Sequence, residues 1–137
     1  MRALLPVPPR VLLWLALAAA AFAPQRVSLL QLTSVDWKPG RPLPTKIRRL
    51  DGRRVWTVGY MHATDEAGMV SFPLVATLKC QCGGTPTPNK FVQVVLEKGS
   101  TDFRPDPVAV RGVLEVGEVE EDGYVVSLYR LRGEIVE

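Results

Sequence analysis

Cys80 and Cys82 are the residues whose type and spacing most clearly allow chemistry, and they are the only cysteines of the chain. Two thiols at positions i and i+2 can form a strained disulfide, exchange electrons, or bind a thiophilic ion such as Cu(I), which needs only two sulfur ligands. A disulfide closing a loop of about three residues stabilises a fold by only ~1.6 kcal/mol, so a purely structural bond explains the pair poorly. We predict a binding site at this pair, with metal or redox chemistry as the alternative and plain local packing as the remaining interpretation.

The residues after the thiols predict a rigid loop. Gly83 and Gly84 permit a bend, and Pro86 and Pro88 stiffen the return toward the next strand. The thiol pair is therefore expected at an exposed edge where a strand meets a loop.

Zinc binding and catalysis have less support. Zinc needs four donors, or three and a water, and the only histidine is His62. A first hairpin turning around residues 63–68 should set His62 opposite residue 69 or 70, roughly 30 Å from Cys80 at ~3.3 Å per strand residue. The sequence has no G-x-S-x-G elbow, no H-E-x-x-H and no phosphate-binding glycine loop. We expect a non-enzymatic protein without a cofactor, or with a thiophilic metal ion under the alternative.

Residues 1–23 have the parts of a signal peptide. Arg2 and Arg10 supply positive charge, residues 11–22 form an unbroken apolar run, and Ala19 and Ala21 form an A-x-A site. As a helix this run reaches only about 20 Å, less than the ~30 Å hydrocarbon core of a bilayer. We predict an exported protein, periplasmic or extracellular, with cleavage after Ala21. If the leader is retained, residues 11–23 would anchor the chain to the membrane.

The positive charge lies mostly ahead of the predicted domain, although the net charge is +3 for 137 residues. Residues 26–54 carry eight Lys and Arg against two Asp, whereas residues 55–137 carry seven against twelve acidic residues. An acidic domain repels a phosphate backbone, so we expect no nucleic-acid partner. The basic run from Lys46 to Arg54 can contact anionic lipid or an acidic partner, or it can be a solvated approach to the first strand.

Residues 24–49 show no sustained period and predict an extended basic lead-in, while residues 50–137 predict an all-β domain. Five short strands favour a small OB-like barrel, because closure removes exposed edges; a small open sandwich is the alternative. The expected strands are Val55 to Met61, Met69 to Leu78, Phe91 to Leu96, Val108 to Val116 and Tyr124 to Ile135.

The last two strands are predicted with their register. Asp122-Gly123 is a strong signal for a two-residue hairpin loop. The apolar face then pairs Val110 with Ile135, Leu114 with Leu131 and Val116 with Tyr129, and it sets Gly112 opposite Gly133 at a bend. The other face pairs Glu115 with Arg130 and Arg111 with Glu134, which are favourable cross-strand charge pairs.

Three segments resemble motifs of an uncharacterised domain family of exported bacterial proteins with OB-like character: LDGRRVWTVGYM at residues 50–61, DPVAVRG at 106–112 and DGYVVSLYRL at 122–131. Many relatives carry Cys-x-His before a proline-rich stretch and Asn-Gln; here Cys82 stands at the His position and Lys90 at that of Gln. The resemblance spans residues 50–137 and implies an exported OB-like domain, sometimes encoded near transporters, with no established activity. It adds Asn89 to Cys80 and Cys82 as a binding residue.

We therefore predict a non-enzymatic, exported binding module of the cell envelope, associated with transport, whose partner is an envelope protein or a small ligand. The alternative is a thiol-based factor that binds Cu(I) or zinc, or acts in redox chemistry, through Cys80 and Cys82.

Overall fold

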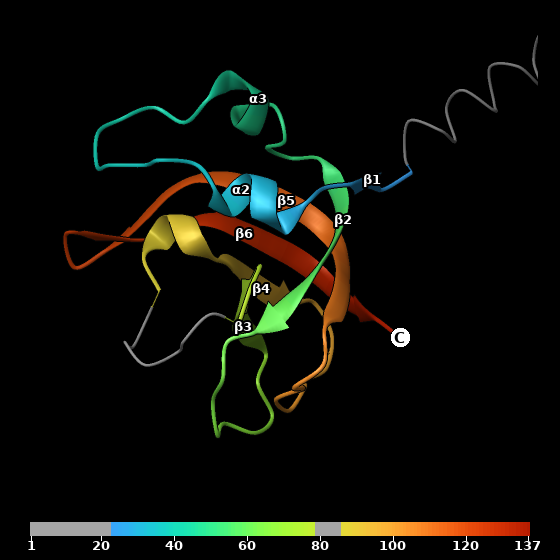
Figure 1. Ribbon diagram of the computed structural model, residues 1–137. Helices are drawn as coiled ribbons and strands as arrows, with labels where there is room; N and C mark the ends of the chain where they lie inside the picture. The colour runs from blue at the N-terminus through green and yellow to red at the C-terminus, as the bar shows by residue number, and fades with distance from the viewer. Residues whose placement is uncertain (1–22, 79–85) are drawn as a thin grey trace, which may run out of the picture.

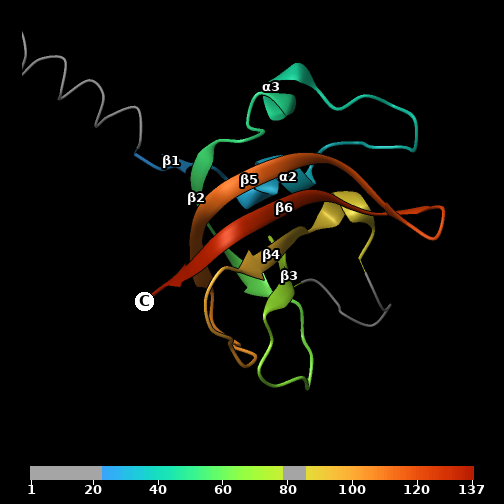
Figure 2. The ribbon, with the colours of Figure 1, turned by 180° about the vertical axis from the view of Figure 1, so that it is seen from behind.

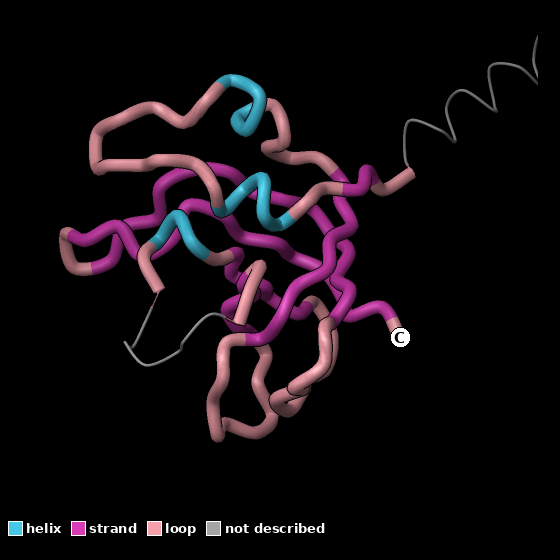
Figure 3. The backbone as a smooth tube through the Cα atoms, in the orientation of Figure 1, coloured by secondary structure: helices cyan, strands magenta, loops and turns pink. Residues whose placement is uncertain are grey.

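The computed structural model describes residues 23–78 and 86–137 (Figure 1). In chain order its elements are β1 (Gln25–Arg26), α2 (Leu29–Thr33), α3 (Thr45–Arg48), β2 (Arg54–Met61), β3 (Ser71–Val75), the 3₁₀ turn η1 (Pro88–Lys90), β4 (Val92–Leu96), β5 (Val108–Glu121) and β6 (Tyr124–Val136). The helical turns are short interruptions in a chain of strands and loops (Figure 3). Among the described residues, no helix has the length and apolarity needed to cross a membrane.

The five expected strands, β2 to β6, are joined in a closed circuit of pairings. β2 pairs with β3 and β3 with β4, both antiparallel; β4 then pairs with β6 in parallel. β6 pairs with β5 and β5 returns to β2, again antiparallel, while β1 adds a short parallel pairing on β2. The all-β prediction is confirmed, and the five strands have the closed order expected of an OB-like fold, with β1 as a sixth strand.

The β5–β6 hairpin has the predicted register. All six predicted cross-strand pairs are present, including Leu114 opposite Leu131 and Gly112 opposite Gly133. Asp122 and Gly123 have φ angles of 52° and 81°, the left-handed conformations that a type I′ turn requires. Figure 2 shows the two strands from behind as two long, curved ribbons that run side by side and join at the turn. Irregular pairing between Val116 and Glu120 bends its outer end.

One predicted charge pair lies opposite in the ladder but does not form an ion pair. Arg111 does contact Glu134, with Nε 2.7 Å from Oε1. Glu115, however, pairs with Arg132 at 2.8 Å and not with Arg130, which lies directly opposite it in the ladder. Arg132 is the diagonal neighbour on the same face, and a long side chain reaches a diagonal partner as readily as a direct one.

The paired glycines bring β5 and β6 too close together for side chains. A Cβ at Gly112 would meet the Arg132 carbonyl and lie 2.7 Å from the Gly133 Cα, and a Cβ at Gly133 would meet the Arg111 carbonyl. Only hydrogen fits on either side of this pair, so the two strands curve here as the sequence predicts for a bend.

The lead-in is not extended, contrary to the prediction. It contains β1, α2 and α3, and its apolar side chains belong to the same hydrophobic core as the strands. Leu29 and Leu32 lie one helical turn apart and are both buried, as is Ile47 in α3. A single short turn is enough to bury such a pair, and it produces no periodic pattern long enough to recognise. The core therefore continues across residue 50.

The first hairpin also differs from the prediction. Met61 pairs with Leu74, and the His62 amide donates to the Pro73 carbonyl at 3.0 Å, so His62 does not face residue 69 or 70. Residues 63–68 contain no two-residue turn signal, and a longer loop leaves the register to tertiary packing. Phe72 and Leu74 are both fully buried, which selects the observed pairing.

Candidate functional site

Of the three binding residues predicted from the sequence, the structure describes one, Asn89. Cys80 and Cys82 fall outside the described residues, so their proposed chemistry stays a prediction. Asn89 is buried in η1, where its Nδ2 donates to the Val35 carbonyl at 3.0 Å and its Oδ1 accepts from the Thr87 hydroxyl at 2.9 Å. The Asn89 amide thus holds the lead-in against the loop before β4.

Metal donors do not gather in the part of the chain that the structure describes. No three side chains of His, Cys, Asp or Glu lie close enough together there to hold a metal ion. His62 is half-buried beside β3, and within this part of the chain it belongs to no such group of donors.

α2 is held in place by hydrogen bonds from distant residues. Besides Asn89, the Lys90 Nζ donates to the Thr33 carbonyl at 3.1 Å, and the Tyr129 hydroxyl donates to the Leu32 carbonyl at 2.8 Å. Tyr129 is fully buried, and this burial raises its pKa to about 12. These bonds satisfy carbonyls at the carboxyl end of a five-residue helix and hold it against the sheet.

A concave, positively charged surface lies between β1, α2 and the segment around α3; we call it the basic cleft. Its volume is about 340 Å³. It is lined by Gln25, Arg26, Val27, Gln31, Lys46, Arg49, Leu50 and Arg53. The four ion pairs found in the described residues use other side chains, so the four cations of the basic cleft have no carboxylate partner there.

The local fold explains why these cations stay unpaired. Ile47 points into the core, which turns Lys46 and Arg49 outward from the short helix. Asp51, the nearest acid in sequence, is engaged elsewhere, because its Oδ1 accepts the Val116 amide at 2.9 Å. The only carboxylate of this segment is thus directed at β5 and forms no ion pair with the cations of the basic cleft.

A second concavity, the apolar groove, lies on the other side of the β1–α2 junction, against β2. Its volume is about 550 Å³, within the range of roughly 300–1,000 Å³ typical of small-molecule sites. It is lined by Arg26, Val27, Ser28, Leu29, Leu30, Trp56, Thr57, Val58 and Ala76. Arg26 and Val27 therefore border both concavities.

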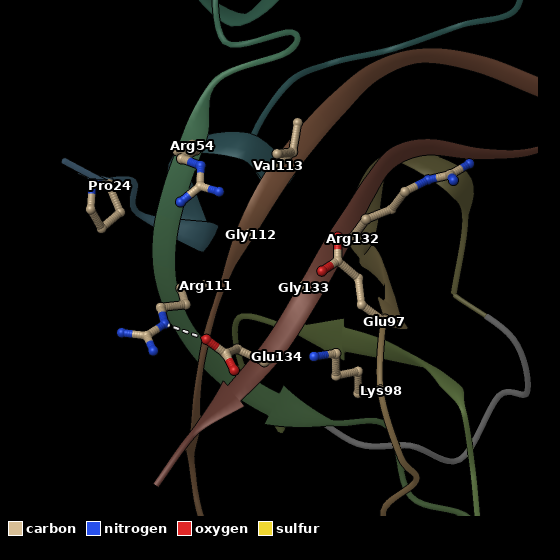
Figure 4. Close-up of a pocket in the computed structure, with 10 residues that line it drawn as sticks. All are labelled: Pro24, Arg54, Glu97, Lys98, Arg111, Gly112, Val113, Arg132, Gly133 and Glu134. Carbon is tan, nitrogen blue, oxygen red and sulfur yellow. Dashed lines mark hydrogen bonds and ion pairs between the residues drawn. The ribbon is translucent and has the colours of Figure 1, made fainter. Parts of the chain in front are cut away.

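A third concavity of about 220 Å³ has the Gly112–Gly133 pair in its lining (Figure 4). Two of its four cations are in ion pairs: Arg111 pairs with Glu134, as the dashed line in Figure 4 shows, and Arg132 pairs with Glu115. Its lining also contains two carboxylates, those of Glu97 and Glu134, whereas the basic cleft has none. Balanced charges attract an added anion less strongly than unpaired ones do. The basic cleft is therefore the stronger anion site of the two.

These features define a small all-β protein of OB-like strand order with a cationic cleft beside an apolar groove. No protein family model matches the sequence, and no curated protein matches it. Three chains of solved structures do match. One is the crystal structure of a DUF3299 family protein from Pseudomonas aeruginosa PAO1, with a TM-score of 0.58 and 20% sequence identity over 84% of this chain and 97% of that chain. This likeness shows a shared fold and agrees with the resemblance to an uncharacterised domain family.

The sequence pointed to only part of this site. The density of Lys and Arg in residues 46–54 indicated a basic surface, which the structure places in the cleft. Arg26, Trp56 and Thr57 were not predicted as site residues, because they come together only through the β1–β2 pairing. The available signal was Arg26 itself, a lone cation just after the predicted leader.

Proposed function

We propose that this chain is an exported, non-enzymatic binding module of the cell envelope, and that it takes an anionic small ligand in the basic cleft. The observation that carries the proposal is the set of four cations without a carboxylate partner in one concave surface. Export rests on the leader features of residues 1–23, and an association with transport rests on the family resemblance.

The chemistry of the lining supports binding of an anion. Arg26, Arg49 and Arg53 carry planar guanidinium groups, which bind carboxylate or phosphate through two parallel hydrogen bonds. Gln25 and Gln31 add neutral amide donors at the same surface. Clustered charge of one sign in a concavity concentrates the electrostatic potential and attracts an ion of opposite sign.

The lining also favours binding over turnover. The residues of the basic cleft include no Ser, Thr, Cys, His, Asp or Glu, so Lys46 is the one nucleophile type in the lining and no carboxylate, imidazole or thiol stands beside it to transfer a proton. A thiol-based metal or redox role through Cys80 and Cys82 stays the alternative that the sequence raises, and it is tested separately below.

The test is a titration with methyl phosphate at low salt, followed by backbone amide NMR. We expect saturable shifts confined to residues 25–31 and 46–53. Replacing Arg49 and Arg53 together by Gln should weaken binding by about tenfold or more, roughly 1.4 kcal/mol, because half of the cations are removed.

The matched control replaces Arg54 and Lys98 by Gln, which removes the same charge from outside the basic cleft. This control should keep most of the wild-type affinity. An equal loss of affinity in both variants would show that methyl phosphate binding depends only on the net charge of the protein. An absence of saturable shifts would refute the proposal.

A further inference from the structure

The apolar groove exists because β2 lacks a strand neighbour along part of one edge. β1 pairs with β2 only at Val55 and Trp56, and β3 pairs with it only at Tyr60 and Met61. Between these pairings no described strand covers this edge of β2, and α2 lies alongside it (Figure 1). The groove therefore runs from the β1–α2 junction along the open edge toward Ala76.

The groove exposes apolar side chains that most folded proteins would cover. Leu30 on α2 is 59% exposed and Val58 on β2 is 44% exposed, and both line the groove with Trp56 and Ala76. Other exposed apolar residues, such as Val70, do not line it. A concave apolar surface bounded by two elements suits a narrow aliphatic chain better than a flat partner.

Thr57, which also belongs to the groove wall, faces the core side of β2, because side chains alternate along a strand and Trp56 and Val58 point outward. Thr57 is only 3% exposed, and its buried Oγ1 has no hydrogen-bond partner in the described part of the chain. This hydroxyl is therefore not available to a molecule in the groove, where binding depends on the apolar side chains and on Arg26.

Arg26 connects the apolar groove to the basic cleft. Its guanidinium carbon lies 4.5 Å from the centre of the Trp56 ring, a cation–π contact that holds the charge at the rim of the groove. Since Arg26 also borders the basic cleft, one molecule bound along the groove can place an anionic group among unpaired cations.

We propose that the apolar groove takes the aliphatic chain of a single anionic amphiphile, such as a monoacyl phosphate lipid, whose head group binds at Arg26 and the adjoining basic cleft. This proposal rests on the proposed function, because the head group uses the same cations. Charge complementarity selects the occupant: unpaired cations border one end of a groove whose remaining lining carries no charge.

The test compares decyl phosphate, kept below its micelle concentration, with methyl phosphate on the protein as isolated from expressing cells. Decyl phosphate should bind about 200-fold more tightly, the ratio expected if four methylene groups of the chain are buried. Replacing Leu30 and Val58 together by Ser should lower this ratio at least tenfold and leave methyl phosphate binding unchanged. Both side chains are exposed, so the variant should fold normally.

The matched control replaces Val70 and Leu78 by Ser. These residues are 60% and 48% exposed and lie outside the groove, so the wild-type ratio should persist. Equal affinity for the two phosphates would overturn the groove assignment and leave the proposed function standing. Binding of neither phosphate would remove both proposals.

Two further outcomes assign the groove to another occupant and overturn the proposal. One is a dimer that the Leu30→Ser, Val58→Ser variant converts to a monomer, which would indicate a second copy of this chain. The other is sedimentation with phosphatidylglycerol vesicles without any preference for decyl over methyl phosphate, which would indicate docking on a bilayer surface.

Discussion

Replacing Tyr129 by Phe tests how the wall of the apolar groove is held. The Tyr129 hydroxyl donates to the Leu32 carbonyl at 2.8 Å, and the tyrosine is fully buried in β6. α2 contains five residues, far fewer than an isolated helix needs to be stable in water. Its position therefore depends on tertiary contacts of this kind.

The expected loss of stability is about 2 kcal/mol. The substitution removes one hydrogen bond and leaves the Leu32 carbonyl without its donor in buried surroundings, which typically costs about 1–3 kcal/mol. The phenyl ring keeps almost the same volume, so no large cavity adds to this value. For a domain of this size the melting temperature should fall by roughly 5–10 °C.

The pH dependence of the difference gives an independent check. Burial raises the pKa of Tyr129 from 10.0 to about 12, so the phenol ionises more readily in the unfolded chain than in the folded one. Its contribution to stability is complete below pH 10 and is lost as the pH rises toward 12. By about pH 11 the stability of the wild type relative to Tyr129→Phe should have dropped by roughly 1.4 kcal/mol.

The assay is urea unfolding followed by tryptophan fluorescence, near neutral pH and at about pH 11. The control is Tyr124→Phe, since Tyr124 is 76% exposed beside the hairpin turn and should change stability little at either pH. A Tyr129→Phe variant as stable as the wild type, or a difference that is the same at both pH values, would refute this account of the α2 anchor.

Three other predictions follow. Thr57→Val should raise the free energy of unfolding of the unliganded protein by about 1–2 kcal/mol, because it removes a buried unpaired hydroxyl; urea unfolding measures it, and a loss of stability would contradict it. Intact mass spectrometry should show a two-dalton loss or bound metal at Cys80 and Cys82 if the thiol alternative holds, and reduced, metal-free thiols in protein from the envelope would exclude it. N-terminal sequencing should show cleavage after Ala21, whereas an intact Met1 in a cytoplasmic fraction would disprove export.

The β5–β6 hairpin shows what local pattern can predict. Two glycines in register, alternating apolar residues and the Asp122-Gly123 turn all specify the same pairing, and the observed ladder agrees. Agreement was possible because a two-residue loop sets register locally. The partners in side-chain ion pairs were harder to predict, because Glu115 forms its ion pair with Arg132 and not with the directly opposite Arg130.

The first hairpin and the lead-in show where local pattern was insufficient. The longer loop after His62 leaves the strand register free, and the burial of Phe72 and Leu74 settles it. α2 has neither the length nor a side-chain cap to identify it from sequence, and it exists because Tyr129 and other distant residues hold its carbonyls.

By itself the sequence determined the all-β class, the positions of five strands and the presence of a basic segment, because alternation, turn residues and charge are properties of neighbouring residues. The lining residues of the basic cleft and of the apolar groove were determined only by the tertiary structure. Arg26 reaches Trp56 through a strand pairing across about thirty residues of sequence, and the open edge of β2 appears only once β1 and β3 have taken their places on either side of it. Pairing between segments distant in the chain depends on packing in the whole core, which no local pattern encodes.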